Sequence, residues 1–211
     1  DPFVANPVPK HPPLDSSMFV TVIKPVNGVF VLNQWQGPSL TEDIKGTFAA
    51  DVFSFILGQP NSRFQKMLVD SGLVDGVGLG YSTLVHTGPI TLQARTDQAR
   101  YERAVAAIEN EISHFADPDY FTDEQMEYAK NQLEIGEIRG QEQTSEFAHT
   151  VSYWWTTGGL DYYLAYIDNL RAVNRKDITD YVRRYIIGQP SVTGILAAQE
   201  DAEALGLAGG M

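Results

Sequence analysis

Hydrophobic residues along the chain follow two spacings, one typical of strands and one typical of helices. β-Branched and aromatic residues dominate Met18 to Ile23, Val26 to Trp35 and Ile90 to Arg95, so these runs predict strands. Proline and glycine between the first two runs, over Pro25 to Gly28, predict a turn that pairs them as a hairpin. A closing strand is predicted over Ser191 to Ala198.

A further strand is predicted between Leu73 and Thr87, where glycines alternate with larger residues. At a period of two the glycines share one face of this strand, and they are Gly76, Gly78 and Gly80. A face without side chains lets a helix or a peptide approach the backbone closely. We therefore expect this face to admit the helix predicted over Ser39 to Leu57, and the strand to form a hairpin with Ile90 to Arg95.

Apolar residues three and four positions apart predict helices over most of the remaining chain. Ser39 with Glu42, and Thr122 with Gln125, have the spacing of capping boxes that open two of these helices. The inward face of the helix after Thr122 is expected to consist of Met126, Ala129, Leu133 and Ile138. The other predicted helices cover Pro60 to Gly72, Tyr101 to Phe115, Thr144 to Thr156, Asp161 to Leu170 and Asn174 to Ile186.

The order of these elements has no regular β-α-β alternation, which disfavours a doubly wound parallel sheet. It predicts the α+β class, with one mixed or antiparallel sheet and helices packed on one face. Five prolines lie in the first 17 residues, a composition typical of an extended linker. We therefore divide the chain into a proline-rich linker or arm, residues 1–17, which we expect to follow a further segment, and one domain, residues 18–211, whose tail after about residue 204 is flexible.

Composition narrows the classes of function. The chain has 211 residues, and its 15 Lys and Arg against 27 Asp and Glu give a formal net charge of -12. Such a chain repels phosphate backbones, so nucleic acid is not an expected partner. The absence of cysteine excludes disulfides, thiolate catalysis and cysteine-bound zinc. No apolar run approaches the ~20 residues that a membrane span needs.

Candidate chemistry is sparse in this sequence. The histidines are too far apart for an H-x-x-E-H motif or its inverse, and they are His11, His86, His114 and His149. Glu146 and His149 have an E-x-x-H spacing, but a diiron site needs two such pairs, so we favour a partly exposed structural pair. The glycine run lies within a strand rather than before a helix, which disfavours a nucleotide site. The aromatic residues between Tyr153 and Tyr166 are expected to pack helices together.

Several segments occur in an order that is characteristic of one family. They are Gln34 to Ser39, Ala49 to Gly58, Ser62 to Gln65, Leu68 to Leu73, the strand with Gly80 and Tyr81, the helix pair Thr144 to Leu170, and the helix Asn174 to Tyr185. Together they resemble the insulinase and mitochondrial processing peptidase family, the pitrilysin-type zinc peptidases, and in particular its inactive domain. The resemblance covers roughly residues 18–200.

In that family two homologous α+β halves form an arm, and two arms enclose a peptide. The resemblance implies that this chain holds no metal ligand or catalytic residue, and that zinc belongs to a homologous catalytic half or partner. It also implies an unfolded peptide as substrate. Some members contribute an Arg, and a Tyr seven residues later, from the non-catalytic side. Tyr81 matches the Tyr, whereas Val74 stands at the Arg position. The residues implied in substrate binding are Tyr81, Gly80 and Gly78.

Two other functions stay open at this point. The chain could be a scaffold or assembly protein of the same fold without a peptidase partner, which includes assembly as a homo-oligomer. It could also be an independent metal-dependent enzyme that uses Glu146 and His149. The residues leave the compartment open, and a bacterial periplasm or envelope and the cytoplasm are both compatible with the resemblance.

Overall fold

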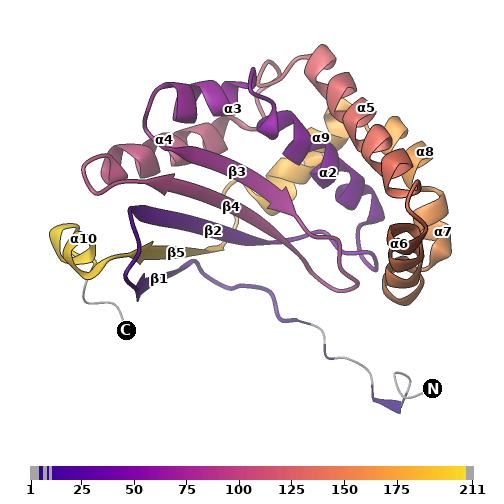
Figure 1. Cartoon of the computed structure of the whole chain (residues 1–211), viewed down its shortest axis with the longest axis horizontal. Helices are drawn as coiled ribbons and strands as arrows, with labels where there is room; N and C mark the ends of the chain where they lie inside the picture. The colour runs from indigo at the N-terminus through magenta and orange to yellow at the C-terminus, as the bar shows by residue number, and fades with distance from the viewer. Residues whose placement is uncertain (1–4, 7–8, 10, 208–211) are drawn as a thin grey trace.

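One five-stranded sheet forms the framework of the computed structural model, which describes residues 5–6, 9 and 11–207 (Figure 1). The strands lie in the order β1-β5-β2-β4-β3. Only β1 and β5 are parallel, and every other neighbouring pair is antiparallel. Their bounds are Met18–Ile23 for β1, Val29–Gly37 for β2, Gly76–Tyr81 for β3, Gly88–Thr96 for β4 and Ser191–Ala197 for β5. The sheet is therefore mixed, as the sequence predicts.

Helices cover one face of the sheet and leave the other face open (Figure 1). Alternation along β2 shows the difference between the faces, since Val29, Val31 and Trp35 are buried while Phe30 and Leu32 are exposed. We call the uncovered side the open face. The helices are α2 (Ile44–Gly58), α3 (Arg63–Gln65) with the π-helix η1 (Lys66–Asp70), α4 (Tyr101–His114), α5 (Asp123–Gly140), α6 (Thr144–Thr157), α7 (Leu160–Leu164), α8 (Tyr166–Ala172), α9 (Arg175–Tyr185) and α10 (Gln199–Ala204). This is the predicted α+β class with helices on one face.

The central helix α2 anchors the covered side. The buried residues of this helix are almost all apolar, and they include Phe48, Val52, Phe53 and Ile56. The ring of Phe53 packs against several aromatic rings contributed by other segments, namely Phe115, Phe121 and Tyr181. Because α2 contacts β3, α5, α8 and α9, it joins the sheet to the helices from the second half of the chain.

Two predicted capping residues open their helices as expected, and a third helix begins later than predicted. Thr122 and Gln125 form a capping box at α5, and Asn174 caps α9. At α2 the cap is Asp43, whose side chain accepts from the Gly46 amide at 2.9 Å. Ser39 instead accepts from the Glu42 amide at 3.2 Å, in a turn before the helix. The expectation that Ser39 opens this helix is therefore wrong by one turn, because a second suitable cap follows it.

The predicted hairpin of the first two strands does not form. Strand β5 lies between β1 and β2, parallel to the first and antiparallel to the second. The chain does turn after β1, with Gly28 at φ +90°, but β1 and β2 have no shared ladder. Turn residues specify a local reversal, whereas the choice of strand partner depends on a segment more than 150 residues away in the chain.

The glycines of β3 face away from the helices, contrary to the expectation that they admit the Ser39–Leu57 segment. A Cβ atom built on Gly76, Gly78 or Gly80 meets no heavy atom within 4 Å. The alternate residue Leu79 is buried, and Val77 and Tyr81 pack against the core. Period-two alternation was predicted correctly, but large apolar residues compete for the covered side and leave the glycines on the open face.

We expect a Gly78→Val variant to keep the free energy of unfolding within about 1 kcal/mol of the parent, because open space surrounds Cβ and valine favours strands. The matched change Gly88→Ala should lower it by about 1–3 kcal/mol through overpacking. There a Cβ atom would lie 2.5 Å from the Ser82 carbonyl oxygen. Urea denaturation measures both. A larger loss for Gly78→Val than for Gly88→Ala would contradict the orientation of β3.

Two helical expectations are corrected. Ile138 is 54% exposed, although it was placed on the inward face of α5, because only the first part of that helix is buried. The helix predicted over Asp161 to Leu170 is divided at Ala165 into α7 and α8.

The described part of the proline-rich arm contacts Gln36, whose Nε2 donates to the Pro12 carbonyl oxygen at 2.9 Å. The predicted fraying of Gly206 to Met211 falls mostly on residues 208–211, which lie outside the described residues.

Candidate peptide-binding surface

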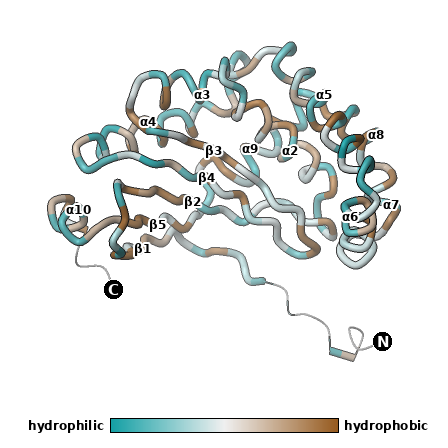
Figure 2. Tube along the Cα trace, viewed as in Figure 1, coloured by the Kyte–Doolittle hydropathy of each residue, from teal (hydrophilic) through white to brown (hydrophobic). Residues whose placement is uncertain are grey.

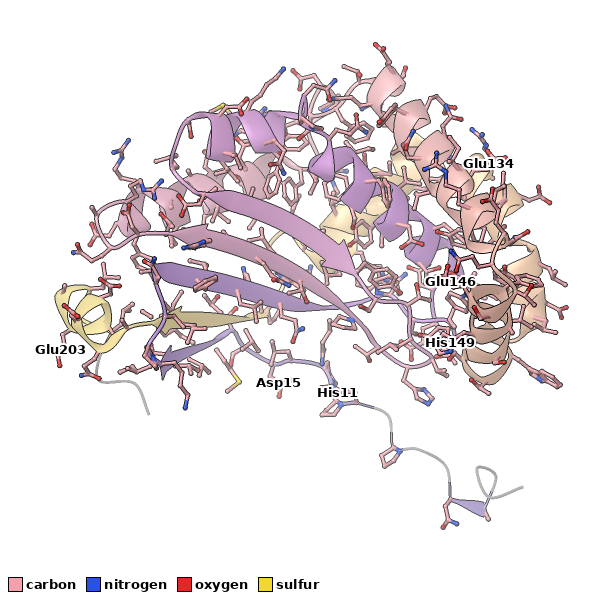
Figure 3. All side chains as sticks on the ribbon, viewed as in Figure 1. His11, Asp15, Glu134, Glu146, His149 and Glu203 are labelled. Carbon is pink, nitrogen blue, oxygen red and sulfur yellow. The ribbon has the colours of Figure 1, made fainter. Side chains whose placement is uncertain are left out.

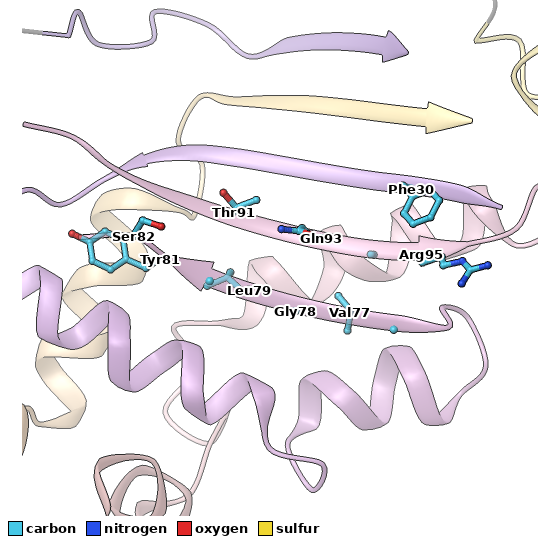
Figure 4. A pocket seen from close by; sticks show the side chains of 12 residues that line it. Phe30, Val77, Gly78, Leu79, Tyr81, Ser82, Thr91, Gln93 and Arg95 are labelled. Atoms are coloured by element: carbon cyan, nitrogen blue, oxygen red, sulfur yellow. The ribbon is translucent and has the colours of Figure 1, made fainter. Parts of the chain in front are cut away.

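A shallow groove of about 700 Å³ lies along strands β3 and β4 (Figure 4). Its floor consists of the glycines of β3 and of polar side chains from β4, and its end is formed by Phe30 of β2. The lining residues are Phe30, Gly76 to Ser82, Thr91 and Gln93 to Arg95. The groove therefore contains the predicted substrate-binding residues Gly78 and Gly80, with backbone accessible where side chains are missing.

Within the described residues, no strand pairs with the outer edge of β3. The Ser82 amide donates to the Pro89 carbonyl oxygen at 3.2 Å, so alternation turns the amide and carbonyl groups of Leu79 and Tyr81 outward. The Val77 carbonyl oxygen also points outward, and there Gln65 Nε2 donates to it at 3.2 Å. A side chain thus covers one end of the edge, while the other end presents backbone groups that an extended peptide can pair with.

Tyr81 occupies the helix-covered side of β3. Its hydroxyl donates to the Pro38 carbonyl oxygen at 2.9 Å, and burial raises the pKa of this phenol above its usual range. A neutral, hydrogen-bonded phenol is suited to positioning a backbone rather than to proton transfer. Val74, at the position of the family's Arg, is buried. The complete Arg and Tyr pair is therefore missing, and any contact of Tyr81 with substrate stays a prediction.

Apolar side chains gather on the half of the sheet away from β3. Hydropathy along the trace shows hydrophobic stretches in β1, β2 and β5 (Figure 2). Five of these residues project from the open face and are each 37–55% exposed: Met18, Val20, Val22, Phe30 and Leu32. We call this set the apolar patch. Contiguous exposed apolar surface of this kind is typical of a face that another protein covers.

The E-x-x-H pair lies on the surface of α6 and has no third ligand near it. Figure 3 shows Glu146 and His149 together on this helix. The labelled residues His11 and Glu203 lie on other parts of the molecule. Among residues 5–6, 9 and 11–207, no group of three or more His, Asp or Glu side chains could hold one metal ion. Helix α6 contains no buried residue. Both side chains are exposed, so the expectation of a partly exposed structural pair stays a prediction.

The aromatic residues of α6, α7 and α8 pack together only in part. The rings of Trp154 and Tyr162 lie 4.9 Å apart, and Phe48 stacks on Tyr162 at 5.2 Å. Predicted helix packing is confirmed for these residues. Trp155, in contrast, is 71% exposed. Tyr153 is also exposed, and its hydroxyl donates to the Thr83 carbonyl oxygen at 3.3 Å, which links α6 to the loop after β3.

A second cavity of about 470 Å³ was not predicted. We call it the acidic aromatic cavity, and it is lined by Asp51, Phe55, Ser82, Thr83, Gln132, Leu133, Gly136, Glu137, Tyr153, Trp154, Tyr163 and Tyr166. The Tyr166 hydroxyl donates to Asp51 Oδ2 at 2.9 Å, and the Tyr163 hydroxyl donates to Glu137 Oε1 at 2.6 Å. The available signal was a lone aspartate within the apolar run of α2, which predicts either a partner or a function.

The two carboxyl groups of this cavity have no cationic partner. Neither forms an ion pair with a Lys, Arg or His in the part of the chain that the structure describes. Burial raises the pKa of Asp51 to about 6, and the hydrogen bond from Tyr166 only partly opposes this. Asp51 thus loses solvation without gaining a counter-charge. Strongly perturbed carboxyl groups in cavities are frequent at functional sites.

Comparison with known proteins identifies the family. The sequence profile described as the Peptidase M16 inactive domain matches residues 4–133, so the chain belongs to this family. The result confirms the resemblance stated above, and the description as inactive agrees with the lack of an H-x-x-E-H motif. A search of curated proteins finds no significant match.

Solved structures of the same fold support this assignment. A protease from Helicobacter pylori has a TM-score of 0.76 and 18% identity, over 91% of this chain and 47% of that one. The inactive peptidase domain of a candidate zinc protease from Bordetella parapertussis has a TM-score of 0.72 and 15% identity, over 82% of this chain and 92% of that one. A peptidase M16 inactive domain from Pseudomonas fluorescens has a TM-score of 0.69 and 13% identity, over 87% and 44%.

The present chain spans about half the length of two of these structures, with 47% of the Helicobacter pylori protease and 44% of the Pseudomonas fluorescens protein. At such low identity the likeness establishes the fold and not the activity. None of the helices in the described ranges combines the length and the apolar character that a bilayer crossing requires.

Proposed function

We propose that this chain is the non-catalytic half of a pitrilysin-type zinc peptidase, which docks on a homologous catalytic half and lines the chamber that holds the peptide. The observation that carries the proposal is the division of the open sheet face. One half is apolar and fits a protein partner, while the other half has a glycine-lined groove beside an unpaired strand edge. Zinc and the water-activating carboxylate belong to the catalytic half in this proposal.

The apolar patch is the proposed docking surface. It lies on β1, β5 and β2, and strand β1 is itself an edge of the sheet. Its occupant is a homologous half-domain, because the chain spans about half of several solved structures of this fold. Covering five half-exposed apolar side chains gives a favourable contribution that grows with the area removed from water.

The groove and the edge of β3 are the proposed peptide surface. An extended peptide would pair with the outward backbone groups of Leu79 and Tyr81, and its side chains would lie over Gly78 and Gly80. Main-chain pairing gives affinity with little dependence on sequence. Open space above the glycines accepts side chains of many sizes, which suits an unfolded substrate.

Activity of the recombined halves tests this function. The catalytic half that carries H-x-x-E-H, from the same parent or from an adjacent gene, is assayed on an unstructured peptide with and without this chain. We expect addition of the chain to raise cleavage at least tenfold, and chelation of zinc to abolish it. The chain alone should cleave nothing. Binding without any gain in cleavage would favour the scaffold function instead.

A charge placed in the apolar patch should prevent docking. Leu32→Glu puts a carboxylate where the partner would exclude water, so we expect it to weaken association with the catalytic half about tenfold. Leu164→Glu is the matched control, since Leu164 is 74% exposed on α7, away from the sheet. Sedimentation or calorimetry measures both. Equal weakening by the two variants would remove the patch as the docking surface.

A further inference from the structure

We propose that the acidic aromatic cavity binds the guanidinium or ammonium group of a basic side chain in the peptide that lies along β3. The inference rests on the proposed function, and it adds a class of substrate to it. The argument combines the position of the cavity, its uncompensated carboxyl groups and its aromatic walls.

The cavity begins where the peptide groove ends. Ser82 lines both hollows, and it follows the last residue of β3 directly. Thr83, the next residue, lines only the cavity and is held to α6 by Tyr153. Figure 1 shows the loop after β3 running toward α6. A peptide paired with the outer edge of β3 would therefore bring a long side chain within reach of this cavity.

The charge of the cavity fits a cation. Its twelve lining residues include Asp51 and Glu137 and no Lys, Arg or His. Each carboxylate accepts from a tyrosine hydroxyl, and Glu137 Oε1 also accepts from Gln141 Nε2 at 3.3 Å, which leaves further lone pairs for a ligand. The chain as a whole carries a formal net charge of -12, so the surrounding field also attracts basic peptides.

The walls of the cavity fit the same ligand. Tyr153, Trp154, Tyr163 and Tyr166 supply aromatic rings, and the first two are in edge-to-face contact at 5.2 Å. Cations bind favourably over aromatic faces, more strongly when they are shielded from water. A guanidinium group also stacks on such rings and can bind a carboxylate through two parallel hydrogen bonds. Carboxylates with aromatic neighbours thus discriminate a basic side chain from a neutral one.

Selectivity for the basic peptide should depend on pH. Asp51 has a pKa of about 6 without ligand, so it is ionised at pH 8 and largely protonated at pH 5. The tyrosines that interact with Asp51 have raised pKa values and stay neutral between these pH values, and they are Tyr81, Tyr162, Tyr166 and Tyr181. The other carboxyl group that faces the cavity is Glu137, beside Tyr166. The preference for a cation should therefore weaken as the pH falls from 8 to 5.

The experiment compares two unstructured peptides that differ only in one arginine, which is replaced by the uncharged isostere citrulline in the second. Binding of each to the full chain, alone and with the catalytic half, is measured by calorimetry at pH 8 and pH 5. We expect the arginine peptide to bind at least tenfold tighter at pH 8. Asp51→Asn and Glu137→Gln should each reduce this ratio several-fold, whereas Asp168→Asn, an exposed change of equal charge on α8, should leave it intact.

Each other outcome overturns part of the proposal. Equal affinity for both peptides removes the cation site but leaves the proposed peptide surface standing. If neither peptide binds, this inference and the peptide surface both fail. N-Acetyl-argininamide serves as a third probe, and binding as tight as that of the whole peptide would show a site for a free cation instead of a peptide side chain.

Discussion

Replacement of Arg63 by alanine is expected to lower the free energy of unfolding by about 3 kcal/mol. Arg63 Nε and Nη2 donate to the two carboxylate oxygens of Glu111 at 3.2 and 3.3 Å. The Glu111 side chain is only 1% exposed, and the Tyr120 hydroxyl donates to it at 2.8 Å. Without the guanidinium group a buried carboxylate would remain with a single neutral donor. The expected loss lies at the lower end for buried pairs because Arg63 is 35% exposed, so water can enter.

The Lys176→Ala variant is the control for this result. Lys176 and Asp180 also form an ion pair, but their side chains are 80% and 58% exposed, so its removal should leave the free energy of unfolding nearly unchanged. Urea denaturation of both variants gives the comparison. The double variant Arg63→Met with Glu111→Gln should recover much of the loss, because no charge is then left buried. Similar losses for Arg63→Ala and Lys176→Ala would refute the importance of the buried pair.

Replacement of Asp51 by asparagine is expected to raise the free energy of unfolding at pH 8, by up to about 3 kcal/mol. Burial raises the pKa of Asp51 from 3.8 to about 6 in the folded chain. The folded state therefore binds the proton more tightly than the unfolded state. The resulting contribution to stability is complete below pH 4 and is lost as the pH rises through about 6. Asparagine carries no charge and can still accept from the Tyr166 hydroxyl.

The pH dependence separates this effect from a general stabilisation. The difference between Asp51→Asn and the parent should be near zero at pH 4, grow between pH 4 and 6, and stay constant above it. Thermal or urea unfolding across this range measures the difference. Asp168→Asn, an exposed change of equal charge, should show no such trend. A stabilisation by Asp51→Asn that is as large at pH 4 as at pH 8 would contradict the role of desolvation.

These two predictions concern two carboxylates, Glu111 and Asp51, which differ in whether a cationic side chain lies beside them. Glu111 is buried with a cationic partner, which explains its position without any ligand. Asp51 is half-buried without one, and it faces a cavity. A group that lowers stability when ionised is retained in proteins chiefly where it serves binding or catalysis. This contrast is the reason that the acidic aromatic cavity, and not the Glu111 pair, carries the further inference.

Local patterns in the sequence predicted most of the elements. β-Branched and aromatic residues predicted β1, β2 and β4, the alternation of glycine with larger residues predicted β3 within a longer segment, and a closing strand was predicted at β5. The three-four spacing predicted α2, α4, α5 and α9. Caps such as Thr122 and Asn174 were predicted because a helix start depends on residues within one turn. The order of elements and the diffuse family motifs together predicted the α+β class and the inactive M16 domain.

Strand order and the orientation of β3 depend on contacts between segments far apart in the chain, which local patterns do not predict. The insertion of β5 between β1 and β2, and the face to which the β3 glycines turn, depend on which segments compete for the covered side of the sheet. The acidic aromatic cavity joins residues from α2, from the loop after β3, and from helices far along the chain. No local spacing connects Asp51 with Glu137 or Tyr166, because packing free energy depends on contacts in space. The sequence by itself thus determined the family and the absence of the catalytic motif, whereas only the tertiary structure placed an uncompensated carboxylate beside an open strand edge.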